Sequence, residues 1–479
     1  MPLKMDTQPA AQGPSHATLF VWMFAVSSLW HYTSSANEIF DFWFHFDPVG
    51  TPLFALAIVS AFVAAVFPNK TGAVLFFAAG QTAAIFLRMP FVADHLVMEL
   101  GLHVAILAAF LMLTWKKDSS TSVSTTDMFT LYSPIGRWLL IVMYFFGTFH
   151  KINPGFLSLD SSCAIPFIDG LPIPASVAAI PLTQYAAIYG TLILETLAMV
   201  LLLSSRTKYF GMLLGMSFHF IIGVSSFGTL AHFSAFALAL HTLFLPSEFG
   251  QRVVADRRVP QFLTTPDAFK VFTVVLVVLQ LSFAYHMYAT RQGFLVNGLF
   301  AIVAITLMTA VAKYGRMKTA DARYRLRSPS LALNLVPVWF FLHCLSPYVG
   351  LGTGGALAMF SGLRTEGGVS NHLILRQPIP LFDYQERIVY IESATNPSLQ
   401  GAANDGQGVI LFDFQRHFSS REQLALPVSL SVGGVSYPID DVEAMQRFAN
   451  EHFEQQSWLE RKYLSFRLVD DPKPNRCRH

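Results

Sequence analysis

Long apolar stretches, separated by short loops of charged or turn-forming residues, make up most of the first 351 residues of the chain. A helix needs about 20 apolar residues to cross a lipid bilayer, and nearly uncharged stretches of this length are typical of such helices. The pattern predicts an all-α polytopic membrane domain at residues 18–351, with about eleven helices. The count is open by one or two, because the first and fifth stretches are short. The eleven stretches are Thr18–His31, Thr51–Phe67, Thr71–Leu87, His95–Trp115, Trp138–Phe149, Ala175–Leu203, Tyr209–Val224, Thr229–Leu245, Val271–Tyr288, Phe294–Val311 and Leu331–Leu351.

The amino-acid composition agrees with a membrane location. Charged residues make up 13% of the chain and hydrophobic residues 53%, whereas soluble proteins carry about 25% charged residues. This balance excludes disordered, collagen-like, coiled-coil and disulfide-rich secreted chains. The net charge is only +2 and no zinc-finger spacing or basic patch occurs, which excludes nucleic acid as a partner and favours membrane lipids.

The loop charges predict the orientation of the chain in the membrane. If residues 1–17 form a cytoplasmic tail and the stretches alternate in direction, the cytoplasmic loops hold most of the Lys and Arg residues, as the positive-inside rule requires. The tail has one Lys, so we expect the first stretch to be a retained helix rather than a cleaved signal peptide. The chain is expected to be a multi-pass protein of the cell inner membrane or the endoplasmic reticulum. The cytoplasmic loops hold Lys70, Lys116, Lys117, Arg137, Arg206, Lys208, Arg252, Arg257, Arg258, Lys313, Arg316, Lys318, Arg323, Arg325 and Arg327, and the opposite loops hold Arg88, Lys151 and Arg291.

Residues 352–479 follow a different pattern. The runs Ile388–Ala394, Gly408–Phe414 and Val428–Ile439 are typical of strands, with Gly-Gly and Asn-Asp-Gly as turns. The segment Asp440–Leu464 is charged and has a helical period. We therefore expect a small α+β domain that is extracytoplasmic, on the same side of the membrane as the loop after the fifth stretch.

Lys151 closes the fifth stretch, in the sequence FFGTFHKINPGFL. Ionisable groups at membrane depth are costly and often functional. A lysine among apolar and aromatic neighbours loses proton affinity, which makes it a usable general base. The alternative is an interfacial lysine whose ammonium group snorkels to the headgroups, although it would do so on the side where this chain avoids lysine.

Three polar residues of the fourth stretch share one helical stripe. His95, Glu99 and His103 are spaced four residues apart in ADHLVMELGLH. They form either a proton relay or substrate contact, or a hydrogen-bonded stripe that fixes helix packing. One helix supplies only adjacent pairs of ligands comfortably, so we expect no metal site here.

Other ionisable residues lie within later stretches. His219 lies mid-span in MLLGMSFHFIIGV, and His232 and His241 fall on opposite faces of the next stretch. A lone histidine in a membrane helix usually hydrogen-bonds to another helix. Glu195, deep in YGTLILETLAMVLLL, must be protonated or paired. We expect it to pair with a His or Arg in a structural role.

Two features are expected near the outer membrane face. Arg364 and Glu366 precede two glycines just past the last stretch, and form either a polar lid or an ordinary turn into the first strand. The chain has three cysteines and no C-x-x-C, which argues against a redox centre or a structural zinc site. A Cys163–Cys344 disulfide is one expectation, because both residues are expected near the oxidising side.

Three segments resemble the vitamin K-dependent gamma-carboxylase-like family, whose membrane part is called the horizontally transferred transmembrane domain. FFGTFHKINPGFLSLDSSCA resembles the lysine loop of that family and is the most specific of the three. GMSFHFIIGVSSFGTLAHFSAFALALHTLFLP resembles its Phe-His helix and the following helix, and PYVGLGTGGALAMFSGLRTEGGVSNHL resembles the segment that closes its membrane domain. The likeness spans most of residues 18–373.

The resemblance implies an activity of the carboxylase, quinol-epoxidising lyase type. In the family, a neutral lysine takes a proton from a reduced quinone, oxygen adds to the quinol, and carbon dioxide traps the carbanion of a glutamate side chain. The implied cofactors are a reduced quinone of the vitamin K or another membrane type, O2 and CO2, and the implied partner is a secreted or lumenal polypeptide. The expected catalytic residues are Lys151, His95 and His219, and the expected cofactor-binding residues are Glu99, His103, Glu195 and Arg364.

Two functions of different classes stay open. The first is a quinol-dependent enzyme of the carboxylase-like class, and the second is a non-enzymatic membrane module that binds lipid or quinone or scaffolds a partner. A transporter is less well supported, because no Gly- or Pro-broken helices occur in two matching halves. The environment of Lys151 discriminates between the first two: the enzyme requires it in an apolar pocket beside His95 or His219, without a carboxylate partner.

Overall fold

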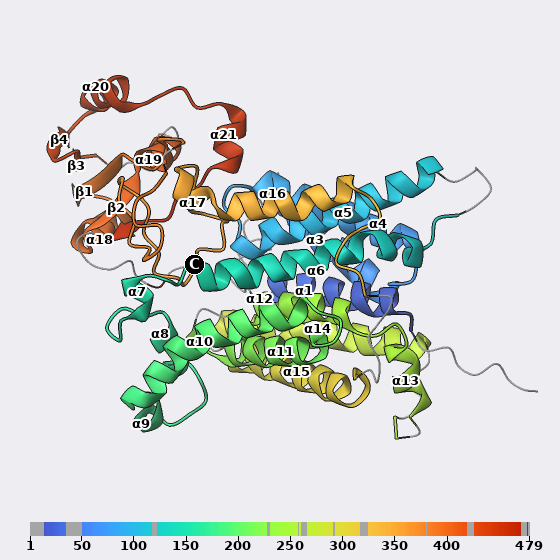
Figure 1. The fold of residues 1–479 in the computed structure, drawn as a ribbon. Helices are drawn as coiled ribbons and strands as arrows, with labels where there is room; N and C mark the ends of the chain where they lie inside the picture. Colours follow the sequence, from blue (N-terminus) through green and yellow to red (C-terminus); the bar gives the residue numbers. More distant parts are fainter. Residues whose placement is uncertain are drawn as a thin grey trace, which may run out of the picture.

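The computed structural model describes residues 14–34, 50–116, 122–227, 230–256, 258–259, 266–290, 293–316, 324–379, 381–418, 426–470 and Cys477. The protein is mostly helical, with a small C-terminal antiparallel sheet (Figure 1). Several residues named above lie outside the described residues: 1–13 of the expected tail, Thr229, and the loop residues Lys117, Arg257, Arg291, Lys318 and Arg323.

Each of the eleven apolar stretches contains a helix. Six helices are long and apolar enough to cross a membrane, namely α4, α5, α6, α10, α14 and α15, and four shorter apolar helices accompany them among the described residues. The protein is therefore a membrane protein by the length and composition of its helices. The helices are α1 (His16–Ser34), α3 (Gly50–Val66), α4 (Thr71–Arg88), α5 (Asp94–Lys116), α6 (Thr125–Phe149), α10 (Pro181–Leu202), α11 (Lys208–Val224), α12 (Ala231–His241), α14 (Pro266–Thr290), α15 (Phe294–Tyr314) and α16 (Leu335–Cys344).

Helix α6 is longer than the fifth stretch predicted. It begins at Thr125, where Ser124 and Asp127 form a capping box, and it continues through Arg137. Arg137 lies just before the start of the predicted stretch, but its guanidinium is buried and donates to the carbonyl oxygens of Leu243 and Arg325, at 2.9 and 2.7 Å. Polarity therefore interrupts the hydrophobic pattern here without interrupting the helix, because tertiary hydrogen bonds satisfy the charged group.

Two other stretches are broken where the sequence predicted one helix. The sixth divides into α9 (Ala175–Ala178) and α10, which starts at Pro181. The last divides into α16 and α17 (Ser346–Val349), which ends at Gly350 in the left-handed conformation. The remaining short helices are α7 (Pro154–Leu157), α8 (Ala164–Asp169), α13 (Phe249–Ala255) and the 3-10 turns η2 (Thr242–Phe244) and η4 (Ala332–Asn334).

Helix α1 lies at the centre of the bundle. It packs against α3, α6, α12 and α14, and Phe20, Phe24 and Trp30 are fully buried. A helix that is apolar on all sides is suited to a position in which other helices or lipid surround it, and here other helices cover α1. The core of the membrane part is therefore built around α1, with α10 and α15 further out.

The C-terminal part forms a five-stranded antiparallel sheet of order β4-β3-β1-β2-β5. The predicted hairpin is present, with Gly433 and Gly434 at positive φ in its turn. The run 408–414 is a strand only in its first half, and the run 440–464 forms two helices rather than one. The elements are β1 (Ile388–Ala394), α18 (Pro397–Asn404), β2 (Gln407–Ile410), α19 (Leu411–Phe418), β3 (Val428–Val432), β4 (Val435–Ile439), α20 (Val442–His452), α21 (Trp458–Tyr463) and β5 (Val469–Asp470).

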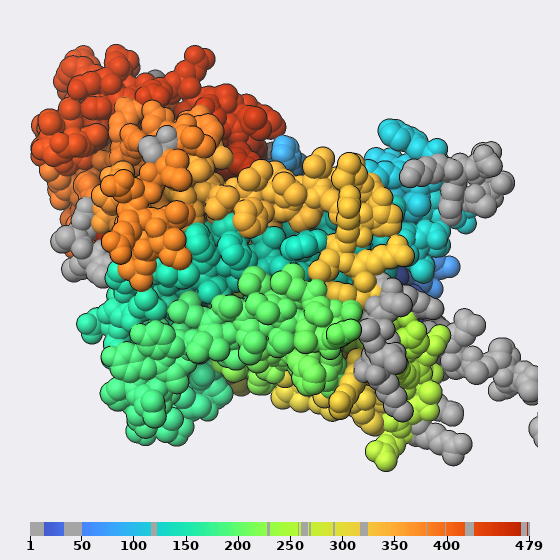
Figure 2. All heavy atoms as spheres, viewed as in Figure 1, coloured from blue at the N-terminus to red at the C-terminus, as the bar shows by residue number. Residues whose placement is uncertain are grey.

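The sheet part and α7–α9 lie at the same end of the helix bundle, and α13 lies at the opposite end (Figure 1). In the space-filling view the C-terminal residues cover one side of that end, while α10 lies at the side of the bundle below them (Figure 2). The loop that follows α6 is therefore placed between the membrane helices and the C-terminal part.

Candidate functional site

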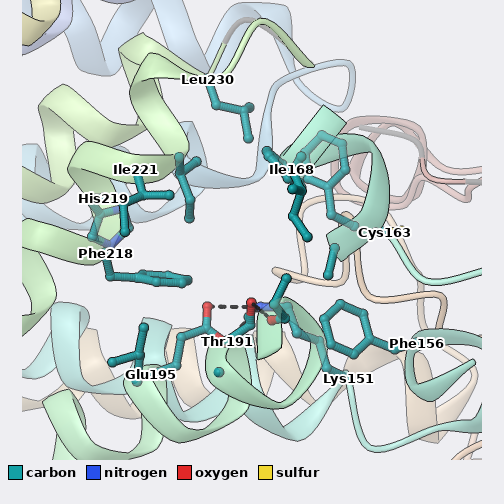
Figure 3. A pocket seen from close by; sticks show the side chains of 18 of the residues that line it. Lys151, Phe156, Cys163, Ile168, Thr191, Glu195, Phe218, His219, Ile221 and Leu230 are labelled. Carbon is teal, nitrogen blue, oxygen red and sulfur yellow. Dashed lines mark hydrogen bonds and ion pairs between the residues drawn. The ribbon is translucent and has the colours of Figure 1, made fainter. Parts of the chain in front are cut away.

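An apolar cavity of about 290 Å³ opens beside the loop that follows α6 (Figure 3). Helices α6, α8, α10 and α11 contribute most of its wall, and residues 357–360 close it from the C-terminal side. Phe156, Phe218 and Leu230 are among its apolar lining residues. Such a cavity suits the apolar body of a ligand, because burying apolar surface is favourable and requires no hydrogen-bond partners.

Lys151 and Glu195 form a buried ion pair in the wall of this cavity. The ammonium group donates to both carboxylate oxygens, at 2.8 and 2.7 Å, and the two side chains are 12% and 9% exposed (Figure 3). The expectation that Lys151 lies without a carboxylate partner is therefore wrong. Glu195 pairs as expected, but its partner is Lys151 rather than a histidine or an arginine.

Gly147 makes this pairing sterically feasible. It lies on α6 one turn before Lys151, and a Cβ at this position would lie 3.1 Å from Oε1 of Glu195. Helix α10 packs directly on α6. The glycine therefore lets the carboxylate approach the α6 backbone closely enough to receive Lys151. In the sequence, the sign of this close approach is a glycine four residues before the lysine.

The residues around Lys151 hold it in place. His150 is fully buried, with Nε2–H donating to the Ala356 carbonyl at 3.0 Å and Nδ1 facing the Tyr348 hydroxyl at 2.8 Å. Asn153 caps α7 by accepting from the backbone N–H of Phe156 at 2.9 Å. Hydrogen bonds therefore fix His150 and Asn153, which flank Lys151 in the chain, and the Lys151 side chain lines the cavity.

Arg364 and its neighbours belong to the loop that covers this region. The Arg364 backbone N–H donates to Asn371 at 2.9 Å, and Nε2–H of His372 donates to the Phe149 carbonyl at the end of α6 at 2.8 Å. Burial lowers the pKa of His372, which keeps its Nδ1 available to accept from the Leu375 backbone N–H. Arg364 is not among the residues that line the cavity, so the structure gives it no ligand contact there.

His219 faces the cavity from α11 (Figure 3). It is 1% exposed, its ring contacts the rings of Tyr144 and Phe233, and neither ring nitrogen has a hydrogen-bond partner among the described residues. A buried polar group without a partner is costly and points to a ligand or water that completes it. His241 differs, because it bonds to Tyr144 at 3.0 Å and to the Ala237 carbonyl at 2.6 Å.

Two residues in the cavity wall have a strained backbone. Leu357 and Phe360 adopt positive φ values of 57° and 54°, and both line the cavity. Residues other than glycine rarely adopt this backbone conformation, which costs about 1–3 kcal/mol per residue. Residues strained in this way are concentrated at functional sites. The strain supports this cavity as the site.

The polar stripe of α5 faces inward, as predicted. His95, Glu99 and His103 are each at most 1% exposed. Glu99 accepts from Ser28 at 3.3 Å, and His103 stacks on Phe24. However, none of the three lines the Lys151 cavity, so the expectation that His95 and His219 share one pocket is wrong.

His95 instead lies beside two other histidines. Its ring centroid is 5.2 Å from that of His31 on α1 and 5.0 Å from that of His232 on α12. The sequence did not single out His31, because nothing local distinguishes a histidine that ends an apolar stretch. One ligand nitrogen from each of the three lies within 4.8 Å of the others, close enough for the three to share a metal ion.

The expected Cys163–Cys344 disulfide is wrong. Cys163 pairs with Cys477, with Cα atoms 5.2 Å apart, while Cys344 is a buried free thiol. Cys344 lies in the last turn of α16 and is fully covered, whereas Cys163 lies at the start of α8. The bond ties the C-terminal end of the chain to the cavity wall, which includes Cys163.

Comparison of the chain with family models, curated proteins and solved structures finds no match. The likeness to gamma-carboxylase-like proteins therefore stays an expectation.

Proposed function

We propose that the protein is an integral membrane protein that binds an amphiphilic ligand of the quinol type in the Lys151 cavity. The observation that carries this proposal is an apolar cavity whose wall holds a buried ion pair and a buried histidine, His219, that has no hydrogen-bond partner in the described part of the chain. The apolar lining would receive the isoprenoid or ring portion of the ligand. The Lys151–Glu195 pair and His219 would receive its hydroxyl or carbonyl oxygens.

A quinol suits this lining better than a phospholipid headgroup does. The ion pair has no net charge, so it favours a neutral polar head over a phosphate, which would compete with Glu195 for the ammonium group. The cavity volume of about 290 Å³ accommodates a ring system rather than two acyl chains. Lys151 Nζ also lies 5.7 Å from the Phe156 ring centroid, so an aromatic surface stands beside the polar group.

The second candidate function is proton abstraction from the bound quinol, as the gamma-carboxylase-like resemblance implies. Its specific support is that Lys151 and His219 line one cavity. The Glu195 carboxylate counts against it, because a lysine base is expected to lie without such a partner, so the reaction needs a prior proton transfer within the pair. Transfer of one proton from the Lys151 ammonium to the Glu195 carboxylate leaves a neutral amine beside a neutral carboxyl group. A low-dielectric site favours such a neutral pair more than water does. The amine would then act as the base, and O2, CO2 and a polypeptide acceptor would be needed for the full reaction.

The proposed topology has eleven crossings, with the C-terminal part extracytoplasmic, in the cell inner membrane or the endoplasmic reticulum. The concentration of Lys and Arg in alternate loops supports this arrangement. The Cys163–Cys477 bond supports it too, because disulfides persist on the oxidising side. In this orientation the cavity opens near the outer end of the bundle, where a lipid-phase ligand and a secreted polypeptide would both have access.

Photolabelling of the full-length protein in nanodiscs tests the binding proposal. A photoreactive menaquinone analogue should label the wild type, and Gly190→Leu should reduce labelling by at least about tenfold. Gly190 lines the cavity and a Cβ there meets nothing within 4 Å, so a leucine has room to occupy ligand space. Gly298→Leu on α15 is the matched control, because its Cβ also meets nothing and it is not in the lining. Equal labelling of the two variants would reject the cavity as the binding site.

Lys151→Arg separates binding from chemistry. Arginine can keep a bidentate pair with Glu195 but does not give up its proton, so the variant should bind the probe and lose quinol oxidation. Lys151→Ala should lose oxidation as well. Quinol oxidation at the wild-type rate in Lys151→Arg would exclude the lysine as the base and leave only the binding function.

A further inference from the structure

Three histidines from three helices converge at the end of the bundle that carries the cavity. His31 lies in the last turn of α1, His95 at the start of α5, and His232 at the start of α12. Their ring centroids are 5.0–5.2 Å apart, and one ligand nitrogen from each lies within 4.8 Å of the others. These residues are separated by long stretches of sequence, so the cluster is a product of helix packing.

We propose that His31, His95 and His232 form a binding site for a divalent transition-metal ion of the zinc class. Zn²⁺ is bound by imidazole nitrogen at about 2.0–2.1 Å, which places neighbouring ligand nitrogens about 3.3 Å apart in a tetrahedral site. The three nitrogens lie within 4.8 Å of one another, so the rings would have to move closer together on binding an ion. Nitrogen ligands favour Zn²⁺, Cu²⁺ and Ni²⁺ over Mg²⁺ and Ca²⁺, which prefer oxygen.

The three histidines are not equally buried. His31 and His95 are 5% and 1% exposed, while His232 is half-buried. Three protein ligands with an accessible side are the arrangement in which a zinc ion keeps a fourth position for water or another ligand. His232 is the most exposed of the three candidate ligands.

A carboxylate on the same face of α5 as His95 would offset part of the charge that an ion adds. Glu99 is one helical turn from His95 on the same buried face of α5, and it accepts from Ser28, three residues before His31 on α1. Its Oε1 has no hydrogen-bond partner among the described residues. An isolated divalent ion is very costly to bury, and a nearby carboxylate reduces that cost.

The site adjoins the ligand cavity but is separate from it. The Phe233 ring contacts His95 on one side, at 5.8 Å, and His219 on the other, at 5.3 Å, between ring centroids. Phe233 lines the cavity, whereas the three clustered histidines do not. Metal binding at the three histidines therefore does not require a quinol in the cavity.

Metal titration of the full-length protein in nanodiscs tests the proposal. After treatment with a chelator, the wild type should bind one Zn²⁺ per chain by elemental analysis. Co²⁺ should give the visible absorption bands of a four-coordinate site, and Zn²⁺ should remove them. His31→Ala, His95→Ala and His232→Ala should each weaken Zn²⁺ binding by more than about 100-fold, because even changes outside the ligand shell cost 10–100-fold.

The controls distinguish loss of a ligand from loss of the fold. His103→Ala removes a buried histidine from the same stripe of α5 and should keep the ion, since His103 packs against Phe24 and Phe77. Lys151→Met should keep it too, whatever becomes of quinol binding. His232→Gln changes the most accessible ligand, so a folded sample is expected even if His95→Ala fails. Absence of stoichiometric Zn²⁺ from the wild type, or unchanged affinity in folded His232→Gln, would overturn the proposal.

Discussion

Lys151 and Glu195 carry opposite charges in a cavity whose other walls are mostly apolar. Removing one member of a buried pair leaves an uncompensated charge, which costs about 3–5 kcal/mol, whereas replacing both by apolar residues is often neutral. We predict that Lys151→Met and Glu195→Leu each lower the free energy of unfolding by that amount, and that the double variant recovers most of the loss. Denaturant unfolding in detergent micelles measures the free energy of unfolding of the three variants. Additive losses in the double variant would show that the two groups are not coupled in solution.

Gly147 is predicted to be required for the same pair. Gly147→Ala would place a methyl group 3.1 Å from Oε1 of Glu195, so the carboxylate must shift, at a cost of about 1–3 kcal/mol in the free energy of unfolding. Gly190→Ala on α10 meets nothing within 4 Å and should be neutral or stabilising by up to about 1 kcal/mol. Thermal unfolding of the two variants compares them directly, and a Gly147→Ala protein as stable as Gly190→Ala would contradict the close approach of α10 to α6.

At the scale of elements, the caps at the two ends of α6 are expected to contribute unequally to the free energy of unfolding. Asn153 closes the C-terminal end: its amide donates to the His150 and Ser361 carbonyls, both at 2.8 Å, while it caps α7. Asn153→Ala leaves these buried groups unpaired and should cost about 2–4 kcal/mol of unfolding free energy. Ser124→Ala at the exposed N-terminal cap of the same helix should cost only about 1 kcal/mol.

Chemical denaturation of both cap variants measures this difference. The larger loss should be accompanied by weaker labelling of the cavity by the quinone probe, because Lys151 follows directly from the end of α6. Equal losses at the two ends would show that the hydrogen bonds of Asn153 are replaced by water.

At the scale of the whole molecule, the charges of the loops predict the topology. We predict that the Gly433–Gly434 turn of the C-terminal sheet and the loop after Arg316 lie on opposite sides of the membrane, because that loop region is rich in Lys and Arg. Protease sites inserted at the two positions should be cleaved from opposite faces of sealed vesicles. Cleavage of both from one face would mean that the number of crossings has the wrong parity.

The disulfide gives a second test at this scale. With denaturant and no reductant, an alkylating reagent should modify one cysteine, Cys344, and with reductant it should modify all three. Mass spectrometry of the modified peptides identifies them. Alkylation of Cys477 without reductant would show that the C-terminal end is not tied to the cavity wall.

Local pattern was sufficient to predict the elements but not their ends. Each apolar stretch contains a helix, and the hairpin around Gly433–Gly434 was predicted from its turn residues. The start of α6 at Thr125 was not, because a buried arginine resembles a loop residue when only the sequence is read. The run 408–414 changes from strand to helix at Leu411, where an apolar run alone does not distinguish the two.

The sequence by itself determined which segments leave water, since transfer of apolar surface depends on composition and period, and it marked Lys151, Glu195 and His219 as costly groups that must be satisfied. Only the tertiary structure decided how they are satisfied. Lys151 meets Glu195, 44 residues away, His95 meets His31 and His232, and Cys163 meets Cys477 across 314 residues. A membrane helix can turn any face toward its neighbours at little cost in hydrophobic burial, because lipid and protein are similarly apolar. The choice of partner is therefore made by close packing, hydrogen bonds and steric details such as Gly147, which act only when distant helices come together.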